Sequence, residues 1–135
     1  MSIESRSCAR WGFPLLVVSS DDQVHSTLGQ ILKESCMFHR ASGRCDALRS
    51  VRRFKPWVVV CDQNLADGDW RDLLTDLQEQ GNTPLIVASR LADDRLWAEV
   101  LNLGGYDLLA NPFAAPEVSR VVTMAANRGG NGGED

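Results

Sequence analysis

The chain has 135 residues, of which 44% are hydrophobic and 24% charged, so it is long enough for one domain with one core and leaves no room for a separate effector domain. Its formal net charge of -4 argues against a general nucleic-acid binder, because such proteins are normally basic. The sequence contains no apolar stretch long enough for a membrane span or a signal peptide.

Short apolar runs alternate along the chain with stretches whose apolar residues recur at helical spacing. Strands are expected at residues 14–18, 37–41, 57–62, 84–89 and 106–110. Helices are expected at about residues 22–34, 44–53, 70–80, 93–103 and 115–127. The central run, between Pro56 and a polar turn, is typical of a parallel strand buried on both faces. Residues 1–13 are expected to form an N-terminal arm, and residues 128–135 a flexible tail.

This alternation of strands and helices predicts a parallel sheet covered by helices on both sides. With right-handed crossovers, the expected fold of residues 14–127 is a doubly wound, flavodoxin-like α/β sandwich of three layers, with five parallel strands in the order 2-1-3-4-5. Ligands of such sheets bind outside the carboxyl ends of the strands. Asp62, at the end of the central strand, is therefore a candidate functional residue, although a strand-end aspartate can also simply cap the next turn or helix.

The cysteines and histidines show no catalytic or metal-binding pattern. The four cysteines lack CxxC spacing and a neighbouring histidine cluster, and Cys36 and Cys61 lie in apolar runs, which predicts buried free thiols in a reducing cytoplasm. His25 and His39 are the only histidines, and neither has the surroundings of a Ser-His-Asp triad. We therefore expect no enzymatic activity.

Basic residues are concentrated in one segment. Between Arg40 and Lys55 lie six of the fourteen basic residues and one acidic residue, Asp46. Most such runs are solvated helix faces, and a docking surface is the alternative. The acidic helix at residues 70–80 could also balance this charge within the molecule. The helix in the basic segment is expected to turn Cys45, Leu48 and Val51 inward and Arg44, Arg49, Arg52 and Arg53 outward.

Polar residues stand at the ends of the predicted strands: Ser19-Ser20, Asp62, Ser89 and Asn111-Pro112. This arrangement resembles the receiver domain of bacterial response regulators over residues 14–127, most specifically at 58–62 with Asp69 seven residues later, at 85–89 and at 106–113. In that family a kinase phosphohistidine transfers a phosphoryl group to the central aspartate, a role that the resemblance gives to Asp62. It also implies that the Ser89 hydroxyl faces Asp62 and binds one phosphoryl oxygen.

The resemblance implies Mg²⁺ and no organic cofactor. The family holds the cation with the phosphoacceptor, here Asp62, with the backbone carbonyl two residues later, here Asn64, and with an acidic pair after the first strand. In this chain Ser19 and Ser20 stand where that pair belongs. A hydroxyl is a weaker ligand than a carboxylate, so we expect reduced metal affinity unless Asp21 reaches the site.

Three further positions depart from the family pattern. Asn111 stands where a lysine binds a second phosphoryl oxygen, which removes a charge-assisted hydrogen bond of roughly 1.5–3 kcal/mol. Leu108 stands where many receivers carry an aromatic residue that rotates on phosphorylation. Arg90 follows Ser89 at a position that is usually small. Its guanidinium could reach the phosphoryl group or Asp62 in place of the missing lysine, and the alternative is that it points to solvent.

Three functions are compatible with these residues. The first is a single-domain response regulator receiver in a phosphorelay, phosphorylated by a histidine kinase or phosphotransfer protein and acting on a downstream protein target. The second is a phosphorylation-independent pseudo-receiver that acts as a binding module. The third is a flavodoxin-like FMN protein. Asp21 and Asp22 argue against it because their carboxylates would repel the FMN phosphate.

The fourth helix carries more apolar residues than one buried stripe requires. Receivers often form homodimers or bind effectors through the fourth helix, fifth strand and fifth helix. We therefore expect Trp97 and Leu101 to lie at such an interface, the alternative being that Trp97 is a core residue. No nucleic-acid or membrane partner is expected.

Overall fold

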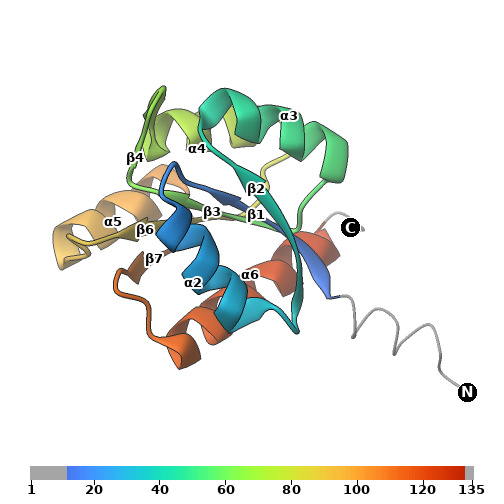
Figure 1. Ribbon diagram of the computed structural model, residues 1–135. Coiled ribbons are helices and arrows are strands. Elements are labelled where there is room, and N and C mark those ends of the chain that lie inside the picture. Colours follow the sequence, from blue (N-terminus) through green and yellow to red (C-terminus); the bar gives the residue numbers. More distant parts are fainter. Residues whose placement is uncertain (1–11, 133–135) are drawn as a thin grey trace, which may run out of the picture.

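A five-stranded parallel sheet forms the centre of the protein in the computed structural model, which describes residues 12–132 (Figure 1). Its strands lie in the order β2-β1-β3-β6-β7, so the predicted fold class and strand order are confirmed. Their bounds are β1 Phe13–Val18, β2 Cys36–Ala41, β3 Val58–Asp62, β6 Leu85–Ser89 and β7 Asp107–Ala110. The apolar runs of β1, β3 and β6 are buried because helices cover both faces of the sheet.

Five helices make up the two outer layers (Figure 1). Their bounds are α2 Asp22–Leu32, α3 Arg44–Phe54, α4 Trp70–Glu79, α5 Asp94–Leu103 and α6 Ala115–Gly132. Apolar side chains of α3, α4 and α5 pack on one face of the sheet, and those of α2 and α6 pack on the other. None of the helices in the described part of the chain is both long enough and apolar enough to cross a bilayer.

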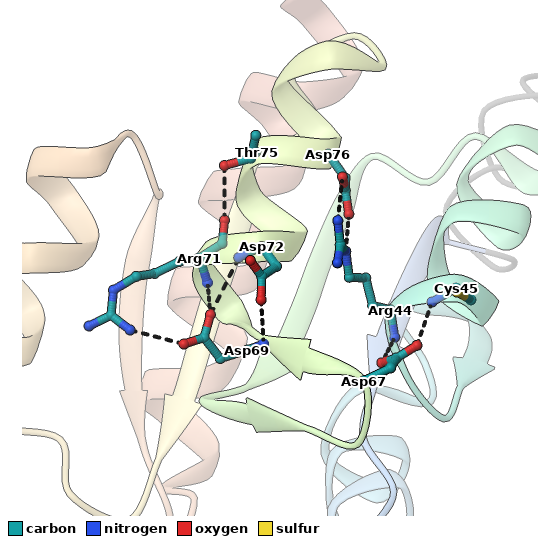
Figure 2. Close-up of polar contacts among 8 residues, drawn as sticks. All are labelled: Arg44, Cys45, Asp67, Asp69, Arg71, Asp72, Thr75 and Asp76. Carbon is teal, nitrogen blue, oxygen red and sulfur yellow. Dashed lines mark hydrogen bonds and ion pairs between the residues drawn. The ribbon is translucent and has the colours of Figure 1, made fainter.

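A two-stranded hairpin, β4 Asn64–Leu65 and β5 Gly68–Asp69, follows the central strand where the sequence predicted only a turn (Figure 2). At its tip, the Asp67 carboxylate accepts hydrogen bonds from the backbone N–H groups of Arg44, at 2.7 Å, and Cys45, at 3.0 Å. The N-cap residue of α3 is Gly43, which has no side chain to offer. Asp67 therefore supplies the cap for α3 from a different part of the chain.

Ion pairs join the three helices on that face of the sheet. Arg44 donates to Asp76 of α4 with 2.5 Å between Nε and Oδ2 (Figure 2). Its side chain is 37% exposed, so it lies outside the core as predicted and is paired with a neighbouring helix. Arg71 of α4 donates to Glu99 of α5, with 2.6 Å between Nε and Oε2. The acidic helix α4 thus neutralises part of the basic segment within the molecule.

Three other expectations need correction. Cys45 is exposed, because α3 buries Ala47, Ser50 and Val51. Helix α6 continues to Gly132, so the predicted tail begins too early. Phe13, which we had assigned to the arm, opens β1. Cys36 and Cys61 are buried free thiols as predicted, whereas the remainder of the arm up to residue 11, including Cys8, and residues 133–135 lie outside the described residues.

Candidate functional site

A shallow pocket lies at the carboxyl ends of the strands, where the sequence placed the candidate site. Asp62 ends β3 and Ser89 ends β6, and the loops after β1 and β7 complete the rim. The pocket is lined by Asp21, Val24, Asp62, Gln63, Asn64, Ala88, Ser89, Arg90, Leu91 and Asn111. The structure therefore brings the predicted site residues together, with the exception of Ser20, which does not line the pocket.

The Asp62 carboxylate is half-buried and accepts a short hydrogen bond from the Ser19 hydroxyl at Oδ2. Burial raises the pKa of Asp62 above its ordinary value, and the negative charge of Asp21 acts in the same direction. The Ser19 hydrogen bond and the positive charges of His25 and Arg90 oppose this rise in pKa. The carboxylate is thus held by one hydroxyl, with two basic side chains near enough to favour its ionised form.

Ser19 is in turn fixed from several sides, and sequence reasoning missed this. His25 of α2 is 4% exposed, and its Nε2–H donates to the Ser19 carbonyl oxygen at 2.8 Å. The Ser19 amide donates to the Ala41 carbonyl at 2.9 Å. Of the two serines after β1, Ser19 donates to Asp62, whereas Ser20 is exposed.

The Ser89 hydroxyl donates to Oε1 of Gln63 at 2.6 Å and accepts from the Leu91 amide at 2.9 Å. We had expected this hydroxyl to face Asp62, and it is instead engaged by the residue next to Asp62. The Gln63 backbone is held at both ends, because its amide donates to the Ala88 carbonyl and its carbonyl accepts from the Trp70 amide. The sequence carried no signal for Gln63 beyond its position after Asp62.

Arg90 and Asn111 complete the polar rim of the pocket. Arg90 is exposed, and its charge favours the ionised form of Asp62 by lowering the pKa of that carboxyl. It forms no ion pair with any other residue in the part of the chain that the structure describes. Asn111 is half-buried, and its backbone N–H donates to the Ser89 carbonyl at 3.0 Å. Both residues thus lie at the mouth of the pocket.

The oxygen donors of the pocket are few. Two carboxylates, Asp62 and Asp21, line it together with Asn64. Asp21 also caps α2, because its Oδ1 accepts from the Gln23 amide at 2.9 Å. Within residues 12–132 no three His, Cys, Asp or Glu side chains form a cluster that could hold a metal ion. Because Mg²⁺ is commonly bound through one or two carboxylates and several waters, this donor set fits the cation at its lower limit.

The surface of α5 is exposed next to β7. Trp97 is 47% exposed and Leu101 38%, so the alternative of a core tryptophan is wrong. The indole Nε1–H of Trp97 donates to Asp107, the first residue of β7, at 3.2 Å. The predicted interface role of Trp97 and Leu101 stays a prediction.

Comparison with known proteins identifies the family. The model of the response regulator receiver domain matches residues 15–123. The KDP operon transcriptional regulatory protein KdpE of Escherichia coli (strain K12) is 30% identical over 74 residues, which cover 55% of this chain and 33% of that protein. The transcriptional regulatory protein SrrA of Staphylococcus aureus (strain NCTC 8325 / PS 47) is 26% identical over 105 residues, which cover 77% of this chain and 44% of that protein. The chain therefore spans less than half the length of either relative.

Among solved structures, the receiver domain of the Francisella response regulator 1452 matches with a TM-score of 0.77. The two chains are 27% identical, and the match covers 87% of this chain and 98% of that one. The described fold is thus shared over almost the whole length of a solved receiver domain.

Proposed function

The chain belongs to the family of response regulator receiver domains, a signalling module of two-component systems, and we propose that Asp62 is its phosphoryl acceptor. The donor would be a histidine kinase or a phosphotransfer protein in the cytoplasm. One observation carries the proposal: Asp62 and Ser89, from two neighbouring strands, line the same pocket at the carboxyl end of the sheet. That is the edge at which ligands bind in doubly wound folds.

In the proposed reaction, a carboxylate oxygen of Asp62 attacks the phosphorus of a phosphohistidine. The P–O bond forms as the P–N bond breaks, and the imidazole leaves with the electron pair of that bond. The nucleophile is the ionised carboxylate. Ser19, His25 and Arg90 favour that form against the effect of burial on the pKa of Asp62. Ser89 would then donate to one oxygen of the transferred group after leaving Gln63.

A divalent cation is part of this proposal. Asp62, the backbone carbonyl of Asn64 and the second carboxylate oxygen of Asp21 would hold Mg²⁺, with water in the remaining positions. When bound, the cation neutralises charge on the phosphoryl oxygens. We propose that it binds weakly, because Ser19 and Ser20 replace two acidic side chains and Asp21 also caps a helix.

Arg90 is proposed to take over part of the role of the missing lysine. It follows Ser89 directly and lines the pocket, and its positive charge lowers the pKa of Asp62. The side-chain amide of Asn111, in contrast, is neutral. Replacing Arg90 with Ala should slow labelling of Asp62 by acetyl phosphate. Arg95→Ala in α5 is the matched control, because Arg95 is also exposed and does not line the pocket. Equal labelling rates in the two variants would mean that the Arg90 side chain points to solvent and does not contact the phosphoryl group.

The phosphorylated form is proposed to act by protein–protein contact. Trp97 and Leu101 on α5, beside β7, offer an exposed apolar surface for a downstream protein target or for a second copy of the chain. We propose no nucleic-acid contact for this domain itself, since the chain is acidic overall.

Intact-mass measurement after incubation with acetyl phosphate and Mg²⁺ tests the central proposal. We expect wild type to gain one phosphoryl group and Asp62→Asn to gain none. Beryllofluoride should likewise bind wild type and not Asp62→Asn. If neither reagent acts on wild type at saturating Mg²⁺, Asp62 is not an acceptor and the chain is a binding module only.

A further inference from the structure

Positive charge that the molecule does not neutralise is concentrated on α3 and the adjoining strand β2. Of the six basic residues between positions 40 and 55, Arg44 is paired with Asp76 and Arg49 with Asp46. Arg40, Arg52, Arg53 and Lys55 form no ion pair within the described part of the chain, and all four are exposed. A protein of net charge -4 thus presents a basic surface along β2 and α3, with Arg40 on the side of the sheet that α2 covers.

An aromatic and apolar cluster lies within this basic surface. The rings of His39 in β2 and Phe54 in α3 stack with centroids 3.9 Å apart, and the Arg53 guanidinium lies 5.4 Å from the centroid of Phe54. Phe54 is 39% exposed and Met37, two residues before His39, is 42% exposed. Burial lowers the pKa of His39, so its ring is neutral at physiological pH and adds to the apolar area. We call Met37, His39, Arg53 and Phe54 the edge patch.

The edge patch lies beside an open edge of the sheet. β2 is the last strand on its side and pairs only with β1, over all six of its residues, among the strands that the structure describes (Figure 1). Its outer edge therefore presents backbone N–H and C=O groups that an extended chain can pair with. Basic side chains at an edge discourage pairing with a like chain, and the same charges attract an acidic one.

We propose that the outer edge of β2, together with the edge patch, is the docking site for an acidic segment of a partner protein in extended conformation. The backbone of the segment pairs with β2. On the side of α3, its apolar side chains cover Met37 and Phe54 and a carboxylate meets Arg53. On the opposite side of the sheet, a carboxylate meets Arg40, which lies beside α2. This contact does not involve Asp62, so it goes beyond the proposed function and exists in the unphosphorylated protein.

A protein segment fits this surface better than a nucleic acid does. Helix α3 has 11 residues and is therefore about 16 Å long, which matches only a few phosphates of a duplex. The helix packed beside it, α4, carries Asp72, Asp76 and Glu79 and would repel a polyanion that extended past α3. An extended peptide runs along the strand instead of across the helices and avoids this repulsion.

The test uses a fluorescein-labelled short peptide in which pairs of glutamates alternate with pairs of valines, so that each face of the extended peptide carries both residue types. It is titrated with the unphosphorylated full chain and followed by fluorescence anisotropy. We expect saturable binding that weakens with salt. Arg53→Glu should raise the Kd about fivefold, because one attraction is lost and one repulsion gained. Arg95→Glu, which makes the same charge change on exposed α5, should leave the Kd unchanged. Amide hydrogen exchange should slow in β2, and circular dichroism should show both variants folded.

Several results would overturn the proposal. They are the absence of peptide binding at low salt, an equal loss of affinity in the two variants, and unchanged exchange in β2 when peptide is bound. Tighter binding of a DNA duplex at the same residues would make the surface a nucleic-acid site. If Arg53→Glu fails to fold, Arg53→Gln replaces it, with an expected rise in Kd of about twofold.

Discussion

The hydrogen bond between Ser89 and Gln63 should slow phosphorylation, and removing it should accelerate the reaction. The Ser89 hydroxyl donates to Gln63 Oε1 at 2.6 Å, so it must leave this acceptor before it can bind a phosphoryl oxygen. Gln63→Met keeps the length of the side chain and removes the acceptor. The backbone hydrogen bonds of residue 63 to Ala88 and Trp70 do not depend on the side chain and remain.

The magnitude follows from the net value of one such bond. A hydrogen bond between neutral groups in a protein contributes about 0.5–1.5 kcal/mol, which corresponds to about a two- to thirteenfold change in the population of free hydroxyl. We therefore expect Gln63→Met to be labelled by acetyl phosphate and Mg²⁺ about two to thirteen times faster than wild type. Gln63→Glu should be slower than wild type, because a charged acceptor holds the hydroxyl more firmly and lies next to Asp62.

Time courses of intact mass measure these rates, and a double-mutant cycle assigns their cause. In a Ser89→Ala background, Gln63→Met should have no further effect, since no hydroxyl remains to be released. An acceleration that persists without Ser89 would mean that residue 63 acts through access to the pocket. An unchanged rate in the single variant would refute the view that Gln63 restrains Ser89.

Three other predictions concern stability and assembly. Asp67→Asn should lower the Tm at neutral pH by weakening the cap of α3. The backbone hydrogen bonds of Cys45 and Arg44 lower the pKa of Asp67, so the stability that this carboxylate contributes is present above its ordinary pKa and is lost as pH falls through the lowered pKa. Thermal melts of wild type and variant should therefore converge in acid. Asp62→Asn should raise the Tm at neutral pH. Burial raises the pKa of Asp62, so this carboxyl group favours the folded state in acid, and the advantage is lost as pH rises through the raised pKa. A variant less stable than wild type at neutral pH would contradict this. Trp97→Ala should abolish any dimer seen by size-exclusion chromatography and scattering of the phosphorylated protein, whereas an unchanged dimer would place the contact elsewhere.

The sheet could be predicted because its signals are local and redundant. The valine run of β3 between Pro56 and a polar turn has few alternatives to a buried strand, and the same holds for β1 and β6. The hairpin of β4 and β5 escaped prediction because strands of two residues are too short to show a period. Its function in the fold, capping α3 through Asp67, depends on a contact between residues 22 and 23 positions apart.

The orientation of α3 was harder to predict than its existence. Its buried residues are Ala47, Ser50 and Val51, and Leu48 packs against the same core, so the inward positions of Leu48 and Val51 are confirmed. Only Cys45 was misplaced, because the small side chains of Ala47 and Ser50 give a weak apolar signal. The outward position of Arg44 could be predicted because a basic residue on a surface helix usually lies there, whereas its ion pair could not. It points to α4 because Asp76 offers a carboxylate there, and only the packing of the two helices determines that contact.

At the site, the strand ends determined which residues meet but not which hydrogen bonds they make. Asp62, Ser89, Arg90 and Asn111 all line the pocket as their positions predicted. Ser19 and Gln63 were missed as hydrogen-bond partners because the choice between two adjacent side chains depends on rotamers and on backbone direction at the end of a strand. The spacing of residues in the sequence gives no information on rotamers or on backbone direction.

Both groups that the proposed chemistry needs are engaged by neutral side chains in the resting site, Asp62 by Ser19 and Ser89 by Gln63. Phosphorylation would therefore exchange two internal hydrogen bonds for two bonds to the phosphoryl group and would release Gln63. Gln63 leads directly into the hairpin whose Asp67 caps α3, and α3 carries the edge patch. The side chain next to the acceptor is thus connected to the basic surface through the β4–β5 hairpin and the hydrogen bonds between Asp67 and α3. This connection gives the resting and phosphorylated states a physical route by which to differ in partner binding.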